Sequence, residues 1–445
     1  MKALIIAAGN GERINHITDG KPKPLLDVLG LTLIERAILS AKKAGINEFV
    51  IVLGYKGRAI KKYLGSGEKH NVKIEYIYNR EWKKENGVSI LKAEKTVGET
   101  FVLLMSDHIF DYRILQNLIK KSRSKCILCV DRSPDAYIDM EDATKVRTDG
   151  KKIIDIGKDI KKYDAVDCGI FLLNKEIFKA IKESVKRGET SLSAAVKILA
   201  KNNKIEVFDI KNLFWLDVDT KKDYVQAKKL LLKNLIKQTD GPVSRHINRK
   251  VSTALTKLFL KTNTSPDTIS LISLFLSVIS CHFFVLGNYF SVILGGIMAQ
   301  LSSIIDGCDG EVARLKFKET KSGAFFDAVL DRYADTLIIF GMVYGFWTLT
   351  GNLLVWIAGF FALSGTLINS YTSDKYKAEF CKPFVSRKMP VGRDARCFII
   401  MIGAFLNQVF YTIVLLSIFT HIENLRRAGF VKLKNLNPGG IKKKI

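Results

Sequence analysis

Acidic residues are scarce in this 445-residue chain, which has 44 Asp and Glu against 70 Lys and Arg and a formal net charge of +26. An excess of this size can indicate a nucleic-acid-binding protein. Here, however, the basic residues flank long apolar runs and are not interleaved with aromatic residues. We therefore expect no nucleic-acid partner, and we attribute the charge to the flanks of membrane segments and to phosphate ligands.

Cysteine is also sparse. The seven cysteines lie at positions 126, 129, 168, 281, 308, 381 and 397. An odd, scattered set argues against the disulfide framework of a small secreted protein. Cys126 and Cys129 form a C-x-x-C within an apolar run, and no second Cys or His pair completes a zinc site, so we interpret them as strand packing. We expect no signal peptide, because the opening apolar run 3–8 is short and leads into Gly9 and Gly11.

The first half of the chain alternates short β runs with helical stretches. This alternation predicts an α/β domain over 1–232 with a Rossmann-like, mostly parallel sheet. The expected strands cover 2–7, 49–53, 74–78, 101–105, 125–130 and 169–173, and expected helices include 33–44, 57–64 and 192–200. A basic helical connector is expected over 233–266, with a break at Asp240-Gly241-Pro242.

Long apolar runs begin after residue 267. The runs 269–286, 289–305, 336–348, 353–371 and 397–420 contain no Lys, Arg, Asp or Glu. Since a helix needs about 20 residues to cross a bilayer, we predict an all-α transmembrane domain over 267–445. The third run is too short to span alone, so its helix is expected to begin within 323–335.

The distribution of charge predicts the topology. Basic residues crowd the segments 245–261, 314–332, 375–396 and 426–444, whereas the turns 287–288 and 349–352 carry none. The positive-inside rule then places the N-terminal domain and the C-terminus in the cytoplasm. Because the last run is basic at both ends, it must cross an even number of times, so its first helix should start in the polar flank.

A fifth helix that starts in this polar flank would carry Arg393 and Arg396 to membrane depth. The turn between the fifth and sixth helices would then lie near Asn407 and Gln408. We therefore expect six helices, with both termini cytoplasmic, in a multi-pass protein of the cell membrane. A single long final helix is the alternative.

Four aspartates lie at helical spacing beside the second and third apolar runs. Asp306, Asp309, Gly310 and Ala313 would share one helix face, and Gly323, Asp327 and Asp331 another. The carboxylates would repel one another strongly, ionisable residues at a membrane usually mark function, and hard divalent cations would relieve the repulsion. The alternative is a set of salt bridges to Arg314, Lys316, Lys318 and Arg332.

The pattern D-x2-D-G-x2-A-R-x8-G-x3-D-x3-D over 306–331 matches every position of the CDP-alcohol phosphotransferase signature, and the resemblance covers roughly 245–430. It implies a six-helix membrane fold, two bound Mg²⁺ or Mn²⁺ ions, a homodimer, and transfer of a phospho-alcohol from a CDP-alcohol to an acceptor hydroxyl with release of CMP. By position, it implies metal ligation by Asp306, Asp309 and Asp327, a metal neighbour and general base at Asp331, and a CDP-binding surface at Gly310, Ala313 and Gly323.

The acceptor site is expected among cations at the cytoplasmic edge. Lys375, Lys377, Arg393 and Arg396 are candidates for binding an acceptor's phosphate, and arginine suits bidentate contact. The alternative is that these four residues are ordinary flanking charges.

A glycine-rich loop follows the first expected strand. Ala8, Gly9 and Gly11 offer backbone N–H groups to phosphates, and Arg13 with Lys23 in the run Lys21-Pro-Lys-Pro-Leu25 would neutralise a triphosphate and its pyrophosphate leaving group. Together these elements resemble the nucleotidyltransferases that activate sugar phosphates, over about 1–230. The resemblance implies base and ribose contacts at Asn86 and Ser89, one Mg²⁺ on Asp107 and either Asp217 or Asp219, and substrate binding at Lys158, Asp167 and Gly169.

The two halves in this order resemble the bifunctional inositol-1-phosphate cytidylyltransferases/di-myo-inositol-phosphate-phosphate synthases of heat-loving archaea and bacteria. The resemblance implies that CTP and inositol-1-phosphate give CDP-inositol, and that CDP-inositol and a second inositol-1-phosphate give di-inositol-phosphate-phosphate, a compatible-solute precursor, and CMP. One alternative is a phospholipid synthase that uses a CDP-linked lipid. Another is a membrane phosphotransferase whose N-terminal domain is a non-catalytic nucleotide-binding regulator.

Overall fold

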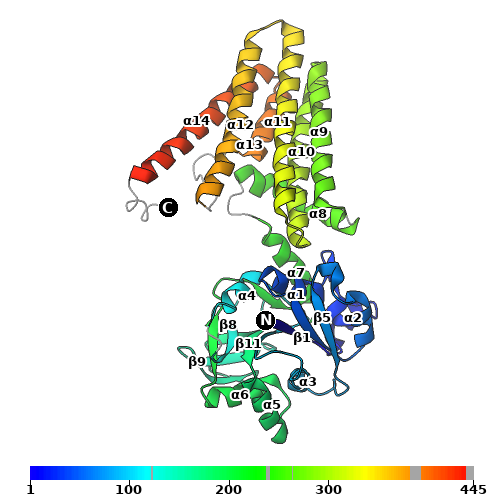
Figure 1. The fold of residues 1–445 in the computed structure, drawn as a ribbon. Coiled ribbons are helices and arrows are strands. Elements are labelled where there is room, and N and C mark those ends of the chain that lie inside the picture. Colours follow the sequence, from blue (N-terminus) through cyan, green and yellow to red (C-terminus); the bar gives the residue numbers. More distant parts are fainter. Residues whose placement is uncertain (122–123, 237–240, 263, 381–391, 437–445) are drawn as a thin grey trace. The chain divides into compact units, whose positions relative to one another are not determined.

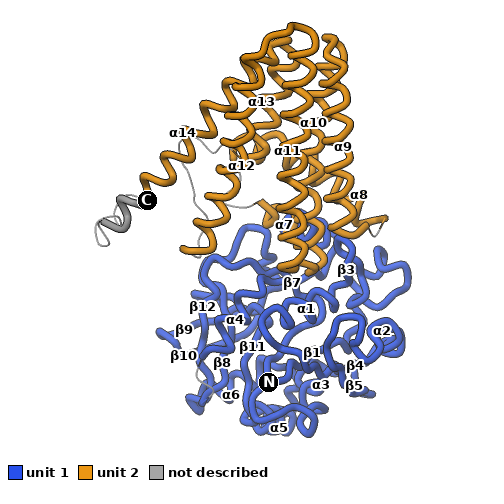
Figure 2. Tube along the Cα trace, turned by 45° about the horizontal axis from the view of Figure 1, so that its top comes forward, with its two compact units in different colours: residues 1–230 blue, residues 231–445 orange. Residues whose placement is uncertain are grey.

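A computed structural model describes residues 1–121, 124–236, 241–262, 264–380 and 392–436. It divides the chain into two compact units, Met1–Leu230 and Leu231–Ile445 (Figure 2). The division falls close to the expected end of the first domain at 232, and the functions assigned to the three segments stay predictions. Asp240 of the expected break, Cys381, and the basic residues of 381–391 and 437–445 lie outside the described residues.

Unit 1 is built on a nine-stranded sheet (Figure 1). In sheet order the strands are β5 (Lys73–Tyr78), β4 (Glu48–Leu53), β1 (Lys2–Ala7), β6 (Thr100–Met105), β11 (Ala165–Asn174), β8 (Cys126–Asp131), β12 (Ile205–Asp209), β10 (Lys152–Gly157) and β9 (Lys145–Asp149). Two short pairs accompany it, β2 (Asp27–Val28) with β3 (Leu31–Thr32), and β7 (His108–Phe110) with β13 (Trp215–Asp217).

The sheet is parallel in one half and mixed in the other. Strands β5, β4, β1 and β6 run parallel, as the strand–helix alternation predicted. Strand β11 is antiparallel to both of its neighbours, β6 and β8. It also pairs antiparallel with β9, as β10 does, so β10 and β11 run in the same direction although no helix lies in the described connection 158–164. The sheet is therefore less uniformly parallel than expected.

Seven α-helices of the described chain surround the sheet or follow it. They are α1 (Leu33–Lys43), α2 (Gly57–Leu64), α3 (Asn86–Lys92), α4 (Tyr112–Leu118), α5 (Glu176–Lys186), α6 (Leu192–Lys201) and α7 (Lys221–Lys233), with short 3₁₀ turns at η1 (Glu12–Ile17), η2 (Lys23–Leu25) and η3 (Glu68–His70). Helix α1 starts at a capping box: the Glu35 backbone N–H donates to Thr32 Oγ1, and Thr32 N–H donates to the Glu35 carboxylate.

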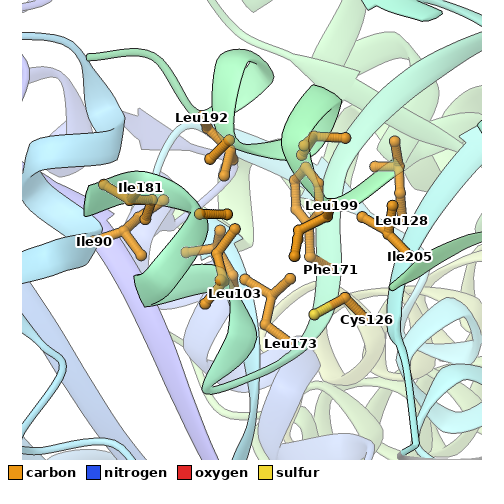
Figure 3. Close-up of a cluster of buried hydrophobic side chains, with 14 of the residues drawn as sticks. Ile90, Leu103, Cys126, Leu128, Phe171, Leu173, Ile181, Leu192, Leu199 and Ile205 are labelled. Carbon is orange, nitrogen blue, oxygen red and sulfur yellow. The ribbon is translucent and has the colours of Figure 1, made fainter. Parts of the chain in front are cut away.

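Helices α5 and α6 cover one face of the sheet and bury a continuous apolar core. Figure 3 shows Ile181 and Leu199 of these helices among strand residues that include Leu103, Leu128 and Cys126. Alternate residues of a strand share a face, and each large aliphatic side chain buried there stabilises the fold by roughly 1.5–3 kcal/mol. Cys126 and Cys129 are both buried in β8, which confirms that this C-x-x-C packs as part of a strand.

Unit 2 consists of helices. They are the π-type turn η4 (Ser244–Asn248), α8 (Arg249–Lys261), α9 (Pro266–Leu286), α10 (Tyr289–Leu315), α11 (Lys321–Thr350), α12 (Leu354–Phe380), α13 (Arg393–Phe405) and α14 (Val409–Leu436). The last apolar run is split as expected: α13 ends at Phe405, α14 begins at Val409, and Asn407 in the turn has φ +53°. The single long final helix is therefore wrong. Helix α11 begins at Lys321, two residues before the predicted interval.

Three helices in the described part of unit 2 are long and apolar enough to cross a membrane: α9, α10 and α12. Helix α11 has the length but carries Asp327, Asp331 and Asp335 in its first half, and α13 has 13 residues. A crossing by all six helices from α9 to α14 therefore remains a prediction.

Small residues let α9 and α11 approach closely. A Cβ atom on Gly345 would lie 1.9 Å from the carbonyl oxygen of Phe284, and one on Gly341 would lie 2.7 Å from that of Cys281. Backbones in such contact gain dispersion energy without a hydrophobic driving force, which is how helices associate within a membrane. The close contact sets α11, which carries two of the motif aspartates, firmly against α9.

Two candidate active sites

A cavity of 580 Å³ lies in unit 1 where strands β1 and β6 end. The carboxyl ends of parallel strands are the usual ligand site of an open α/β sheet. Every unit 1 residue singled out from the sequence lines this cavity: Ala8, Gly9, Gly11, Arg13, Lys23, Asn86, Ser89, Asp107, Lys158, Asp167, Gly169, Asp217 and Asp219. The structure thus brings together segments that are up to 211 residues apart in the chain, from Ala8 to Asp219.

Gly11 allows the loop to lie against Lys23. Its φ is +62°, and a Cβ atom there would lie 2.7 Å from Lys23 Cβ. A larger residue would be strained by the backbone conformation and would also push the lysine away. The loop and the lysine are therefore held in one arrangement.

Lys23 is the central cation of the cavity. Its side chain is 6% exposed, its Nζ lies 2.7 Å from Asp107 Oδ2 and 3.6 Å from Asp217 Oδ1, and it also donates to Asp219. Burial opposes the charge, but the three carboxylates outweigh it and raise the pKa of Lys23 well above its ordinary value. Lys23 therefore stays cationic at every physiological pH.

Arg13 and Lys158 both pair with Asp142, a residue that was not predicted from the sequence. Arg13 Nη1 and Lys158 Nζ each lie 2.5 Å from an oxygen of Asp142, and Arg13 Nη2 also donates to Asp219. Hydrogen bonds from Lys158 and Arg13 lower the pKa of Asp142 to about 2. The residue belongs to no motif, and the available signal was a cluster of acids over 135–142 in an otherwise basic chain.

The pairing of β13 with β7 builds a candidate metal site. It sets Asp217 opposite His108, so that Asp107, His108 and Asp217 each offer a ligand atom within 4.8 Å of the others. Asp217 Oδ1 is buried and has no hydrogen-bond partner among the described residues, as suits an atom that ligates a cation. Asp219 is instead bound to Lys23 and Arg13. Of the two candidates left open by the sequence, the geometry favours Asp217.

The expected substrate-binding turn packs against His108. Asp167 accepts a hydrogen bond from the Gly169 N–H at 2.7 Å, and burial raises the pKa of Asp167 to about 6. Gly169 has φ +69°, and a Cβ atom there would lie 2.5 Å from His108 Nε2. Nearby, Asn86 Oδ1 accepts from the Leu192 N–H at 2.9 Å, so its amide also holds the start of α6.

Helices α10 and α11 build the second site. Asp306, Asp309 and Asp327 each offer a carboxylate oxygen within 4.8 Å of the others. Asp327 Oδ1 is buried without a hydrogen-bond partner among the described residues. Three oxygen ligands of this kind fit a hard divalent cation. Asp331 lies outside that group and pairs with Arg393, whose Nη1 is 2.5 Å from Asp331 Oδ1 and 2.7 Å from Asp306 Oδ1.

Serines of α9, which were not predicted from the sequence, hydrogen-bond to the carboxylates and fix their positions. Ser270 Oγ donates to Asp309 Oδ2 at 2.5 Å, and Ser273 Oγ donates to Asp306 Oδ1 at 3.3 Å. Further along the same buried face, Ser277 bonds Ser302, and Ser280 donates to the Gly295 carbonyl. The spacing 270, 273, 277 and 280 in an apolar run was the signal, because it places every hydroxyl on one helix face.

The four basic residues expected to bind the acceptor do not lie together in the structure. Arg393 reaches the carboxylates, whereas Arg396 forms a buried pair with Asp335 at 2.6 Å. Lys375 pairs with Glu379 at 3.1 Å near the exposed end of α12, where Lys377 is also exposed. In the described part of unit 2, the contacts and cavity linings that join Arg393 to the aspartates include neither lysine.

The small motif residues have local roles as well. A Cβ atom on Gly310 would lie 3.0 Å from Arg314 Nη1, and one on Gly323 would lie 2.9 Å from Thr320 Oγ1. That threonine oxygen accepts from the Gly323 N–H at 2.9 Å and so caps α11. Ala313 lies half-buried on α10 between Gly310 and the end of the helix.

Two family models match the chain, Nucleotidyl transferase over residues 2–234 and CDP-alcohol phosphatidyltransferase over residues 263–422. The protein is thus an enzyme with two transferase domains, and the second makes it a membrane protein. Both families generally use divalent metals.

Relatives match the chain over nearly its whole length. The "Bifunctional IPC transferase and DIPP synthase" of Aquifex aeolicus is 35% identical over 428 residues, which is 95% of this chain and 96% of the relative. The protein of the same name from Thermococcus kodakarensis is 34% identical over 94% of this chain and 95% of its own. The chain belongs to this family of bifunctional IPC transferases and DIPP synthases. A solved inositol-1-phosphate CTP transferase from T. maritima is 26% identical, with a TM-score of 0.47, over 52% of this chain and 95% of its own.

Proposed function

We propose that the chain makes CDP-inositol in unit 1 and consumes it in unit 2, yielding di-inositol-phosphate-phosphate, a precursor of a heat-protective solute. The observation that carries this proposal is the presence of both carboxylate sites, complete in their motif residues, in a chain aligned over nearly its whole length with the bifunctional relatives. A non-catalytic first unit would not need the ion pairs that hold Lys23 and Arg13 in the cavity.

In the first reaction, a phosphate oxygen of inositol-1-phosphate attacks the α-phosphorus of CTP. A new P–O bond forms, the bond to the β-phosphate oxygen breaks, and pyrophosphate leaves. Lys23 and Arg13 stabilise the charge that develops on pyrophosphate, while the backbone of 8–11 lies along the phosphates. Asn86 and Ser89 contact the base and ribose, and Lys158, Asp167 and Gly169 bind inositol-1-phosphate.

In the second reaction, a hydroxyl of another inositol-1-phosphate attacks the phosphorus that carries inositol in CDP-inositol. The bond from this phosphorus to the bridging oxygen breaks, CMP leaves, and the hydroxyl proton passes to the Asp331 carboxylate. Gly310, Ala313 and Gly323 line the CDP surface. Positioning supplies much of the rate in such transfers.

The carboxylates in both units fit Mg²⁺ or Mn²⁺. One ion would be held by Asp107 and Asp217, and two by Asp306, Asp309 and Asp327 with Asp331 beside them; a bound ion neutralises phosphate oxygens and polarises the phosphorus. Six membrane crossings by α9 to α14, cytoplasmic termini and a homodimer complete the proposal.

The test uses purified full-length protein in detergent with Mg²⁺, CTP and inositol-1-phosphate, followed by ³¹P NMR. We expect pyrophosphate, CMP, and a new phosphodiester beside a phosphomonoester. Lys23→Ala should abolish pyrophosphate release yet leave transfer from supplied CDP-inositol, and Asp331→Asn should show the opposite pattern. Loss of both activities in either variant would contradict two separate sites, and CDP-inositol without further product would overturn the proposed acceptor.

A further inference from the structure

The candidate metal ligand Asp217 lies on a very short strand. Strands β13 and β7 have three residues each and form a sheet of their own, separate from the nine-stranded sheet, with one further backbone hydrogen bond at each end. A two-stranded ladder is marginally stable by itself, and a shift of one residue would turn each side chain to the opposite face. The register that sets Asp217 opposite His108 therefore needs support from outside this ladder.

Asp131, the last residue of β8, ties the ladder to the nine-stranded sheet. Its Oδ2 accepts a hydrogen bond from Trp215 Nε1 at 2.9 Å, and its Oδ1 accepts from the Ser133 N–H at 2.9 Å. Asp131 is 6% exposed and Trp215 is 4% exposed. Because a buried indole N–H without an acceptor is costly, the bond to Asp131 restricts where the Trp215 ring can lie.

Trp215 transmits this restraint to the cavity. It lines the cavity together with Asp217, and residues two apart on a strand point to the same face. Its ring also stacks on His108, with the ring centroids 6.3 Å apart and the planes at 25°. His108 Nδ1 lies 3.0 Å from Asp107 Oδ1 and 3.7 Å from Asp217 Oδ1. A movement of the indole would therefore disturb every member of the candidate metal group of unit 1.

We propose that Asp131 is a positioning residue for the metal site of unit 1 and holds Asp217 and His108 in place through the indole of Trp215. The inference rests on the proposed function of unit 1, in which Asp107 and Asp217 hold a divalent ion, and extends it. Asp131 does not belong to the described lining of the cavity. Any effect of its substitution on the metal must therefore pass through other side chains.

The test compares two residues that end strands of the same sheet. Asp131→Ala removes the bonds to the indole and to the backbone. The matched control is Asn174→Ala at the end of β11, because Asn174 Oδ1 also accepts from the backbone N–H two residues on, that of Glu176, at 3.1 Å. Asn174 lies outside the described cavity lining as well. Both variants should lower the Tm of unit 1, so a lower Tm does not distinguish positioning from structural support.

The first distinguishing measurement is the Mg²⁺ concentration for half-maximal pyrophosphate release from CTP and inositol-1-phosphate. We expect it to rise roughly 10-fold or more in Asp131→Ala, since loss of a residue that orients a metal ligand has effects of this size. Asn174→Ala should match the wild type, and transfer from supplied CDP-inositol should be unchanged in both variants. An unchanged Mg²⁺ dependence in Asp131→Ala, or an equal rise in the control, would overturn the proposal.

The second measurement is Mn²⁺ binding to the full-length protein without substrates, followed by EPR. Asp107→Ala serves as the reference in which the site of unit 1 has lost a ligand. Asp131→Ala should bind Mn²⁺ more weakly than the wild type and approach this reference, whereas binding equal to the wild type would overturn the proposal. If the wild type released no pyrophosphate, the proposed function of unit 1 would fail, and Mn²⁺ binding would still test the role of Asp131.

Trp215→Phe tests the route through the indole. Phenylalanine keeps an aromatic ring beside His108 but cannot donate a hydrogen bond to Asp131. If Asp131 acts through this N–H, the double variant should need no more Mg²⁺ than the more affected single variant, because contacting residues are not additive. Single effects that multiply in the double variant would refute the route.

Discussion

Gly169→Ala should destabilise unit 1, and with it the first active site, by more than the strain of the backbone conformation alone. An L-residue in the left-handed region costs roughly 1–2 kcal/mol, and Gly169 has φ +69°. The new methyl would also lie 2.5 Å from His108 Nε2 and must displace this buried imidazole. His108 Nδ1 lies 3.0 Å from Asp107 Oδ1, and loss of a charged hydrogen bond costs roughly 1.5–3 kcal/mol. The two costs together come to about 2.5–5 kcal/mol.

Gly150→Ala is the matched control for that experiment. Gly150 has φ +59°, lies in the exposed turn between β9 and β10, and has nothing within 4 Å of an added Cβ atom. It should show the backbone cost alone, so the two variants should differ by roughly 2 kcal/mol. For a unit of this size the difference corresponds to ~4–8 °C in Tm.

The assays are thermal unfolding and pyrophosphate release from CTP and inositol-1-phosphate. Gly169→Ala should lose most of that activity, because His108 and Asp107 move together, while transfer from supplied CDP-inositol continues. Gly150→Ala should retain both activities. Equal Tm values and equal pyrophosphate release in the two variants would refute the steric argument.

Two further changes probe contacts found in the structure. Ser270→Ala removes the hydroxyl that donates to Asp309, and the Mg²⁺ concentration for half-maximal transfer should rise roughly 10-fold or more; Ser280→Ala, which loses a bond to a backbone carbonyl, should leave it unchanged. Glu35→Gln should destabilise unit 1 by roughly 2–3 kcal/mol at pH 7, measured by chemical denaturation. Burial raises the pKa of Glu35, but hydrogen bonds from His70, Thr32 and Lys69 outweigh it and lower this pKa. The stabilisation is therefore present above the ordinary carboxyl pKa, and the difference should shrink as the pH falls below about 4; a constant difference would contradict the assignment.

Strands that consist of apolar runs could be predicted from the sequence, whereas half-exposed strands rich in polar residues could not. β1 spans Lys2–Ala7 as expected, because its run of aliphatic residues is buried on both faces. β9, with sequence KVRTD, is the last strand in the sheet order, and β10 lies beside it; both were missed because they are half-exposed. Their stability comes from pairing with neighbours rather than from their own composition. β11 pairs antiparallel with β6, β8 and β9, and these long-range pairings depend on the tertiary fold, so its direction was not readable either.

Site residues that belong to a motif were predicted from the sequence. A residue that only holds another side chain in place was not. Asp306, Asp309 and Asp327 converge because helical spacing places them on facing surfaces. Asp142 sits in no repeated spacing, and its partner Arg13 is 129 residues away in the chain. Contacts over such separations depend on the tertiary fold, which a pattern of neighbouring residues does not contain.

Arg393 connects the topology to the chemistry of unit 2. The basic ends of the last apolar run required a helix that starts in a polar flank, and α13 does begin at Arg393. The nearly buried guanidinium is tolerated because Asp306 and Asp331, on two other helices, lie within 2.7 Å of it. Those carboxylates in turn need a nearby cation to remain close together. The charge of Arg393 lowers the hydropathy at the start of α13, and the same charge joins α10, α11 and α13 around one site.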